Sequence, residues 1–96
     1  MARYAISDVA LSDLADIRHH VAADNPTEAD RLINALFHRF DLIARHPELG
    51  ATRPEFSGGE LRFHSVGSYA IVYRTVDGGV EIARVLHGAR DLKSLL

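Results

Sequence analysis

Cysteine is absent from this 96-residue chain, which excludes a disulfide framework and a thiolate metal site. No hydrophobic run approaches the roughly 18 residues that a helix needs to span a bilayer, and the first residues lack the apolar core of a signal peptide. Lysine is nearly absent as well, since Lys93 is the only one. No internal repeat, low-complexity tract or linker is visible. The sequence therefore predicts one cytoplasmic domain over residues 1–96, without a membrane segment.

The remaining composition is that of an ordinary globular protein, with 47% hydrophobic residues, 25% charged residues and a formal net charge of −2. This net charge does not indicate nucleic-acid binding. The distribution is uneven, because acidic residues outnumber basic ones as far as Glu48 and the balance turns slightly basic after it. Nearly all of the cations are arginine, which makes bidentate contacts to carboxylates and phosphates.

Two helices are predicted in the N-terminal half. A short apolar stretch over residues 3–6 reads as an edge strand, and Ser7 is a good N-cap for a helix over residues 8–23. Asn25 is the N-cap of a second helix, which carries a continuous apolar stripe and ends before Pro47. The short connection predicts an antiparallel hairpin whose apolar faces need a sheet to cover them.

The C-terminal half is predicted to be a loop followed by a three-stranded antiparallel meander. Proline and glycine punctuate the loop over residues 47–59. The strands are residues 61–66, residues 68–74 and the run that begins at Val80, the last two joined by the turn Asp77-Gly-Gly. Residues 91–96 are predicted to form a helical turn or an ordered tail. The predicted fold class is therefore α+β, a short strand and a two-helix hairpin packed on the meander.

Both faces of the last strand are rather apolar. One face is predicted to carry Val80, Ile82 and Leu86 with Arg84 interrupting, and the other Glu81, Ala83, Val85 and His87. The helical hairpin can cover only one face of the sheet, so the other is predicted to be a bare surface that binds a partner. The alternative is that the sheet twists and the C-terminal tail folds over this face.

The candidates for chemistry are cationic and lie in the same half of the chain. They are Arg62, His64, Arg74, Arg84, His87 and Arg90. Arg62 and His64 are two residues apart on a strand and so share a face. Such a cluster could hold a phosphodiester, with a histidine as general acid or base. The alternative is that each arginine pairs with a nearby carboxylate, and that His87 only bonds the backbone at the end of a strand.

Metal and cofactor sites have no support in the sequence. The histidines of the two helices show no recurring metal-ligand spacing, and no Gly-rich phosphate loop, nucleophile elbow or paired-carboxylate signature is visible. We therefore expect no metal and no cofactor.

The order of the elements and several motifs resemble the RelE/ParE toxins of bacterial type II toxin–antitoxin pairs, over essentially the whole chain. The most specific motifs are Tyr4-x-x-Ser7-x-x-Ala10-x-x-Asp13-Leu14-x-x-Ile17, His46-Pro47-x-x-Gly50-x-x-Arg53-Pro54 and Leu61-Arg62. The strongest are Tyr69-x-Ile71-Val72-Tyr73-Arg74 and Ile82-x-Arg84-Val85-Leu86-His87-Gly88-x-Arg90-Asp91. The resemblance implies a hetero-oligomer, in which an antitoxin wraps the toxin with its C-terminal segment and holds it inactive. Acidic antitoxin side chains would meet the arginines.

The family has two activities, and the residues favour one of them. RelE-like members cut mRNA on the ribosome with a basic strand cluster, an Arg after the Tyr of the central strand and often a Tyr near the C-terminus. ParE-like members poison DNA gyrase. Here Ala70 follows Tyr69, and neither Tyr nor His follows Arg90. The resemblance implies a ParE-like gyrase inhibitor whose partner-binding or toxicity residues are Arg62, Arg74, Arg84, His87 and Arg90.

Two alternatives remain open. A RelE-like, ribosome-dependent endoribonuclease would bind phosphate with Arg62, Arg74 and Arg90 and carry the proton on His64 or His87. A degenerate toxin would only bind its antitoxin. If the toxin inhibits gyrase, we expect Arg90 to contribute more to toxicity than Arg84, because Arg90 follows the exposed end of the strand.

Overall fold

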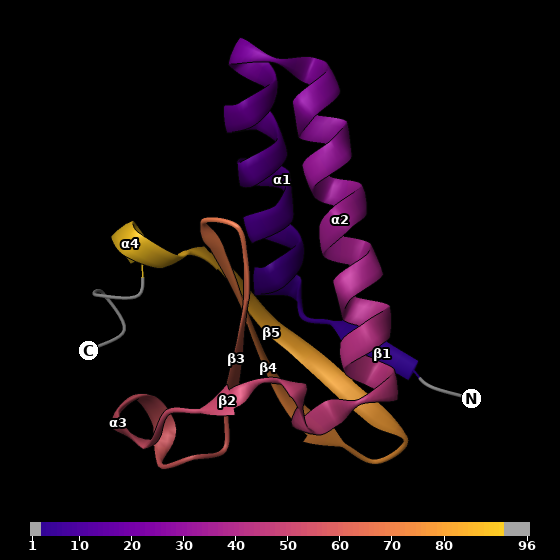
Figure 1. Ribbon diagram of the computed structural model, residues 1–96, viewed down its shortest axis with the longest axis vertical. Helices are drawn as coiled ribbons and strands as arrows, with labels where there is room; N and C mark the ends of the chain where they lie inside the picture. Colours follow the sequence, from indigo (N-terminus) through magenta and orange to yellow (C-terminus); the bar gives the residue numbers. More distant parts are fainter. Residues whose placement is uncertain (1–2, 92–96) are drawn as a thin grey trace.

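In the computed structural model, which describes residues 3–91, two long helices lie on one face of a mixed sheet (Figure 1). The elements are β1 (Arg3–Ile6), α1 (Asp8–Asp24), α2 (Pro26–Arg45), the 3-10 helix η1 (Pro47–Leu49), β2 (Ala51–Thr52), α3 (Pro54–Ser57), β3 (Arg62–Val66), β4 (Tyr69–Val76), β5 (Gly79–His87) and α4 (Gly88–Asp91). This is the predicted α+β order of strand, helical hairpin and antiparallel meander.

The two long helices begin at the predicted caps. Ser7 Oγ accepts a hydrogen bond from the Ala10 N–H at 3.0 Å, and Asn25 Oδ1 accepts one from the Glu28 N–H at 3.1 Å. Only the lower part of the hairpin packs on the sheet, and its tip reaches well beyond the strands (Figure 1). The overhanging part of α1 therefore has a side that no strand covers.

The sheet has five strands in the order β1-β5-β4-β3-β2. The predicted meander is confirmed as β3, β4 and β5, and β1 joins the edge of β5 in parallel. The prediction of a loop throughout residues 47–59 is wrong in part. Ala51 and Thr52 pair with β3 as a short fifth strand, and η1 and α3 flank it.

A β-bulge interrupts β5. Val72 of β4 lies opposite Arg84, whereas the next residue, Tyr73, lies opposite Ile82. Ala83 is therefore an extra residue that has no pairing partner on β4. Because side chains alternate between the faces of a strand, one extra residue reverses the alternation beyond it.

The bulge overturns the predicted faces of this strand. Val80 and Ile82, before the bulge, and Val85, after it, all pack in the core beneath the helices. Leu86 packs on the opposite face with Phe63. The prediction that Leu86 shares a face with Val80 and Ile82 is therefore wrong, as is the placement of Val85 on the other face.

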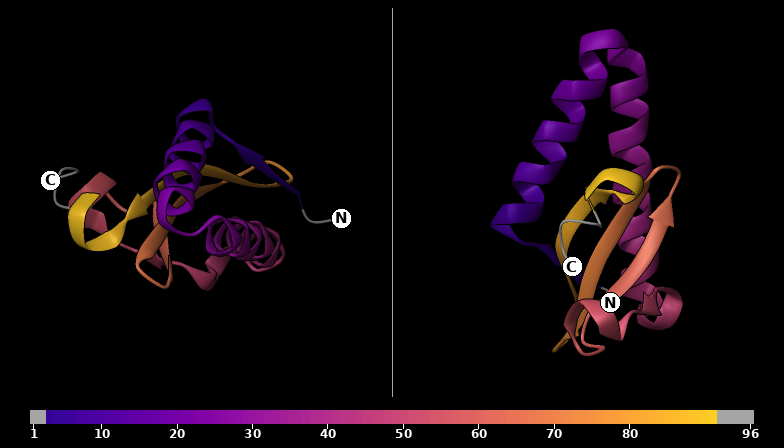
Figure 2. Two further views of the ribbon diagram at one scale, coloured as in Figure 1. Left: turned by 90° about the horizontal axis from the view of Figure 1, so that it is seen from above. Right: turned by 90° about the vertical axis from the view of Figure 1, so that its left-hand side faces the viewer.

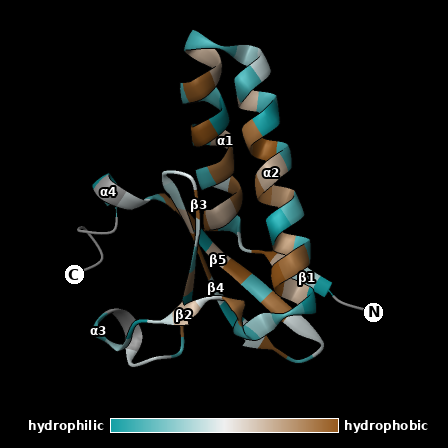
Figure 3. Ribbon diagram, viewed as in Figure 1, coloured by the Kyte–Doolittle hydropathy of each residue, from teal (hydrophilic) through white to brown (hydrophobic). Residues whose placement is uncertain are grey.

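The main core lies between the helices and the sheet. Leu36, Phe40 and Ile43 of α2 meet Ile71 and Tyr73 of β4, and all five side chains are fully buried. Hydrophobic residues gather along the inner sides of both helices and on the strands (Figure 3). This packing fixes α2 against the sheet and so sets the position of α1 beside β5.

The second face of the sheet is not bare. Phe63, Val72 and Leu86 on this face are at most 9% exposed, so the prediction of an uncovered apolar layer is wrong for these residues. α4 crosses one end of the strands on this side and α3 lies near the other end (Figure 2, right), and the Arg53 guanidinium lies 5.6 Å from the centre of the Phe63 ring. Of the predicted helical turn or tail over residues 91–96, only Asp91 is described, as the last residue of α4, and residues 92–96 lie outside the described residues.

Candidate functional site

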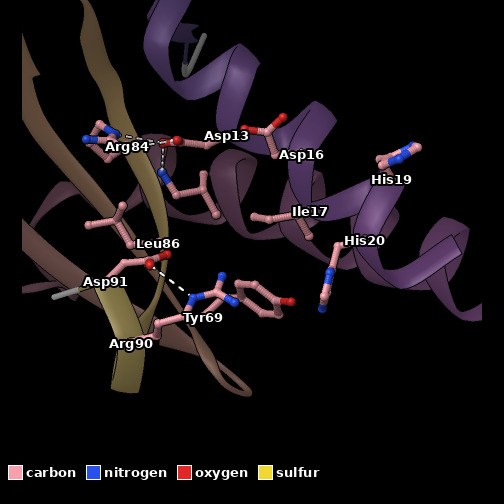
Figure 4. Close-up of a pocket in the computed structure, with 11 residues that line it drawn as sticks. Asp13, Asp16, Ile17, His19, His20, Tyr69, Arg84, Leu86, Arg90 and Asp91 are labelled. Atoms are coloured by element: carbon pink, nitrogen blue, oxygen red, sulfur yellow. Dashed lines mark hydrogen bonds and ion pairs between the residues drawn. The ribbon is translucent and has the colours of Figure 1, made fainter. Parts of the chain in front are cut away.

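A cleft of about 530 Å³ lies between the overhang of α1 and the ends of β4, β5 and α4 (Figure 4). Acidic and histidine side chains of α1 form one wall. The other wall contains Tyr69, at the start of β4, with Arg84 and Leu86 of β5 and Arg90 of α4. Two of the predicted toxicity residues, Arg84 and Arg90, therefore line one cavity.

Asp13 of α1 holds Arg84 in a bidentate ion pair. Arg84 Nε lies 2.8 Å from Asp13 Oδ2 and Nη2 lies 3.0 Å from Oδ1. The Val85 N–H donates to Oδ2 of the same carboxylate at 3.0 Å. The hydrogen bond to Asp13 raises the pKa of Arg84, so the guanidinium is charged and its charge is balanced within the chain.

The outer edge of β5 explains this arrangement. β1 covers the edge only as far as Ile82, so the backbone beyond the bulge needs other partners. Ser7 Oγ donates to the Ala83 carbonyl at 2.9 Å, and the His87 N–H donates to Asp91 Oδ2 at 2.9 Å. The side chains of Ser7, Asp13 and Asp91 thus supply the hydrogen bonds that a neighbouring strand would otherwise make along this edge.

Arg90 is the more open of the two arginines in the cleft. Its side chain is 66% exposed, and its Nε lies 3.2 Å from Asp91 Oδ1. The backbone hydrogen bond from His87 and the contact with Arg90 lower the pKa of Asp91. The carboxylate is therefore ionised and ties α4 to the end of β5.

His87 lies behind the cleft wall with its ring edge-on to Tyr69, the ring centres 5.5 Å apart. Its Nδ1 is buried and has no hydrogen-bond partner within the described residues. A buried N–H without an acceptor costs more than a buried lone pair, so we assign the hydrogen to Nε2. The prediction that His87 bonds the backbone is not met by the ring, although its main-chain N–H binds Asp91.

Arg62 and His64 share a face, as predicted, but this face lies beneath α2 and away from the cleft. Arg62 Nη1 donates to the carbonyl of Gly50 at 2.7 Å. His64 Nε2 lies 2.9 Å from Nη1 of Arg39 on α2. Burial and this guanidinium lower the pKa of His64, so the imidazole is neutral and accepts the Arg39 hydrogen bond.

Arg74 lies near the β4–β5 turn, at the other end of the hairpin from Tyr69 and His87. Its Nε lies 2.8 Å from Oε1 of Glu81, in the cross-strand pair of the hairpin. The six cationic candidates therefore do not form one cluster, and the predicted alternative of arginine–carboxylate pairs is confirmed for Arg74, Arg84 and Arg90.

Asp13 is a site residue that belongs to a motif of the family resemblance but was given no role from the sequence. It lies on the sheet-facing side of α1, three residues after the buried Ala10 and four before Ile17. A carboxylate on the apolar stripe of a helix needs a partner when it is buried. That pattern is the signal that could have identified it.

Metal and membrane sites receive no support from the described residues. Within residues 3–91, no three potential ligands are placed to hold a metal ion. No helix in that part of the chain is both long and apolar enough to cross a membrane.

Comparisons with known proteins identify the family. The profile of the family described as "ParE toxin of type II toxin-antitoxin system, parDE" matches residues 4–92. Toxin RelE2 of Caulobacter vibrioides (strain ATCC 19089 / CIP 103742 / CB 15) is 35% identical over 82 residues, which are 84% of this chain and 89% of that protein. A solved chain titled "Chromosomal ParDE TA system from P. aeruginosa" has the same fold, with a TM-score of 0.73 and 19% identity over 91% of this chain and 96% of that one. The chain belongs to the ParE toxin family of type II toxin–antitoxin systems, within the RelE/ParE superfamily.

Proposed function

We propose that this toxin inhibits DNA gyrase in the cytoplasm and that a cognate antitoxin neutralises it by direct binding. Membership of the family implies an antitoxin partner. The choice of gyrase is the finer part of the proposal. The observation that carries it is the dispersal of the groups that an endoribonuclease needs.

An RNA-cleaving site needs a general base, a general acid and phosphate-binding cations within hydrogen-bond reach of one phosphodiester. Here Arg62 and His64 face α2 and already bind Gly50 and Arg39. Arg90 lies in the cleft beside α1 instead. One RNA phosphate could not contact both sets in this arrangement, which favours a toxin that acts by binding.

The two histidines also fit catalysis poorly. His64 has a lowered pKa, and its Nε2 is engaged by Arg39. The Nδ1 atom of His87 is buried, so an RNA substrate could not reach this nitrogen in the arrangement described. Ala70 follows Tyr69 where the nuclease branch has an arginine.

The second candidate is a RelE-like, ribosome-dependent endoribonuclease. One observation favours it: a relative that is 35% identical carries the name Toxin RelE2. In this case Arg62, Arg74 and Arg90 would bind phosphate, and His64 or His87 would carry the proton, after the contacts described above had been exchanged for contacts to RNA.

The two candidates are separated by two assays on one preparation of the purified toxin. In the first, gyrase supercoils a relaxed plasmid while the toxin is titrated. In the second, translating ribosomes are incubated with the toxin and the mRNA is mapped by primer extension. The proposal expects loss of supercoiling and intact mRNA. Toxin preincubated with its antitoxin is the control and should leave gyrase fully active.

The opposite pattern, cut mRNA with supercoiling untouched, would establish the endoribonuclease and overturn the proposal. A toxin that affects neither target but still binds its antitoxin would be a degenerate copy, which also contradicts the proposal.

A further inference from the structure

The cleft beside α1 carries an exposed carboxylate at one end and an exposed guanidinium at the other. Asp16, on the α1 wall, is exposed and pairs with no cation within residues 3–91. Arg90, on the α4 wall, is 66% exposed and contacts Asp91 through Nε. Its two Nη atoms make no hydrogen bond to a described residue.

The other charged groups of the cleft are already engaged. Asp13 holds Arg84 and the Val85 N–H, and Asp91 holds the His87 N–H and Nε of Arg90. His19 and His20 also line the α1 wall. After these pairs are formed, the Asp16 carboxylate remains in excess at the Asp13 end, and the two Nη atoms of Arg90 remain open to a further acceptor at the other end.

The half-buried side chains of Ile17 and Tyr69 offer apolar atoms between the two ends. Figure 4 shows Asp16 close to Asp13 near the top of the cleft, Arg90 beside Tyr69 at the bottom, and Ile17 between them. Such a surface can bury the stem of a long charged side chain while its charged end reaches a partner of opposite sign. The cleft is thus a slot with a carboxylate at one end and a guanidinium at the other, so its two ends differ in charge.

We propose that this slot docks a segment of the antitoxin that directs a basic side chain toward Asp16 and an acidic side chain toward Arg90. The occupant packs apolar atoms on the half-buried side chains of Ile17 and Tyr69. Charge complementarity selects this occupant and fixes its orientation, because a reversed segment would bring like charges together at both ends. The inference rests on the proposed function, since it specifies how the toxin recognises its antitoxin.

Charge reversal tests the direction of the slot. The affinity of the purified cognate antitoxin is measured by calorimetry for the wild type, Asp16→Arg, Arg90→Glu and the double variant. We expect each reversal to weaken binding by about 10- to 100-fold. Asp24→Arg, at the exposed end of α1 and outside the cleft, is the matched control and should stay within about twofold of the wild type. Circular dichroism verifies that each variant is folded.

A rescue experiment makes the test specific. Antitoxin variants that restore tight binding to Asp16→Arg are selected from a library, and the inference expects them to replace one basic residue by Asp or Glu. Unchanged affinity of Asp16→Arg, or rescue only by changes that leave antitoxin charge alone, would overturn the inference. Gyrase inhibition by the wild-type toxin is measured separately, so failure of the proposed function and failure of this recognition give different results.

Discussion

The phenol oxygen of Tyr73 accepts a hydrogen bond from the N–H of Gly50 at 2.6 Å, in the buried interior. The same hydroxyl donates to the Pro47 carbonyl at 2.7 Å. One side chain from the middle of the sheet therefore holds both ends of the turn that follows α2. A Cβ at position 50 would lie 2.7 Å from the Tyr73 ring and hydroxyl, which explains why glycine occupies the third position after Pro47.

Replacing Tyr73 by Phe removes both hydrogen bonds and leaves the Gly50 N–H and the Pro47 carbonyl without this partner. We expect the free energy of unfolding to fall by about 1–3 kcal/mol, measured by urea denaturation. Tyr4→Phe is the matched control, since the Tyr4 ring packs on Phe40 and its hydroxyl makes no hydrogen bond to a described residue. Equal free energies of unfolding for Tyr73→Phe and Tyr4→Phe would show that the two hydrogen bonds of the Tyr73 hydroxyl contribute nothing to stability.

Removing the Asp13 carboxylate should destabilise the junction of α1 with β5. Asp13→Ala orphans the Val85 N–H, so we expect a loss of about 1–3 kcal/mol in the free energy of unfolding. The ion pair itself adds little, because Arg84 is more than a third exposed. Asp13→Asn keeps an acceptor for the N–H and should lose less.

The control for Asp13 is Asp41→Ala, which removes an exposed ion pair with Arg45 on the surface of α2. Its expected cost is below about 0.5 kcal/mol. Hydrogen exchange at Val85 gives a second readout and should accelerate in Asp13→Ala alone. A Val85 amide that stays protected in this variant would contradict the role given to Asp13.

The stability of the protein should depend on pH through His64. Burial and Arg39 lower the pKa of His64 in the folded state below its ordinary value of 6.5. The unfolded chain therefore takes up a proton first as the pH falls, and this uptake favours unfolding. The contribution of His64 to stability is complete above pH 6.5, decreases as the pH falls through that value and levels off below the folded-state pKa.

The measurement is the free energy of unfolding between pH 8 and pH 5, for the wild type and for His64→Gln. Glutamine cannot titrate, so the difference between the two proteins should change over this range. Parallel curves would exclude the lowering of the His64 pKa that is assigned to burial and Arg39.

The two arginines of the cleft should differ in toxicity. Arg84→Ala frees the Asp13 carboxylate and acts mainly on the edge of β5, whereas Arg90→Ala removes an exposed charge that is available to a partner. We expect Arg90→Ala to abolish growth inhibition in cells and Arg84→Ala to reduce it less. Circular dichroism of the purified variants and protein levels in the cells are measured in parallel, so that a loss of folding is recognised. Greater toxicity of Arg90→Ala than of Arg84→Ala would contradict this assignment.

Much of the fold follows from local signals in the chain. Ser7 and Asn25 cap the two helices, and the Gly-rich turn makes the hairpin of β4 and β5. These features depend on residues near one another in sequence. The family resemblance added the order of the elements as a whole.

The errors arise where distant residues decide the outcome. Ala83 forms a bulge because β5 passes from β1 to the side chains of Ser7 and Asp13, more than 70 residues away in sequence. No periodicity within β5 reveals this change. In the same way, the six cationic candidates are close in sequence order, but the two ends of the sheet and its two faces separate them.

The most direct test of the central claim is the topology of a reporter plasmid in cells that express this toxin without its antitoxin. Gyrase inhibition predicts that the plasmid shifts toward relaxed topoisomers on a chloroquine gel within one generation, before translation declines, and that co-expressed antitoxin prevents the shift. An unchanged plasmid in cells that stop growing and accumulate cut mRNA would contradict the account.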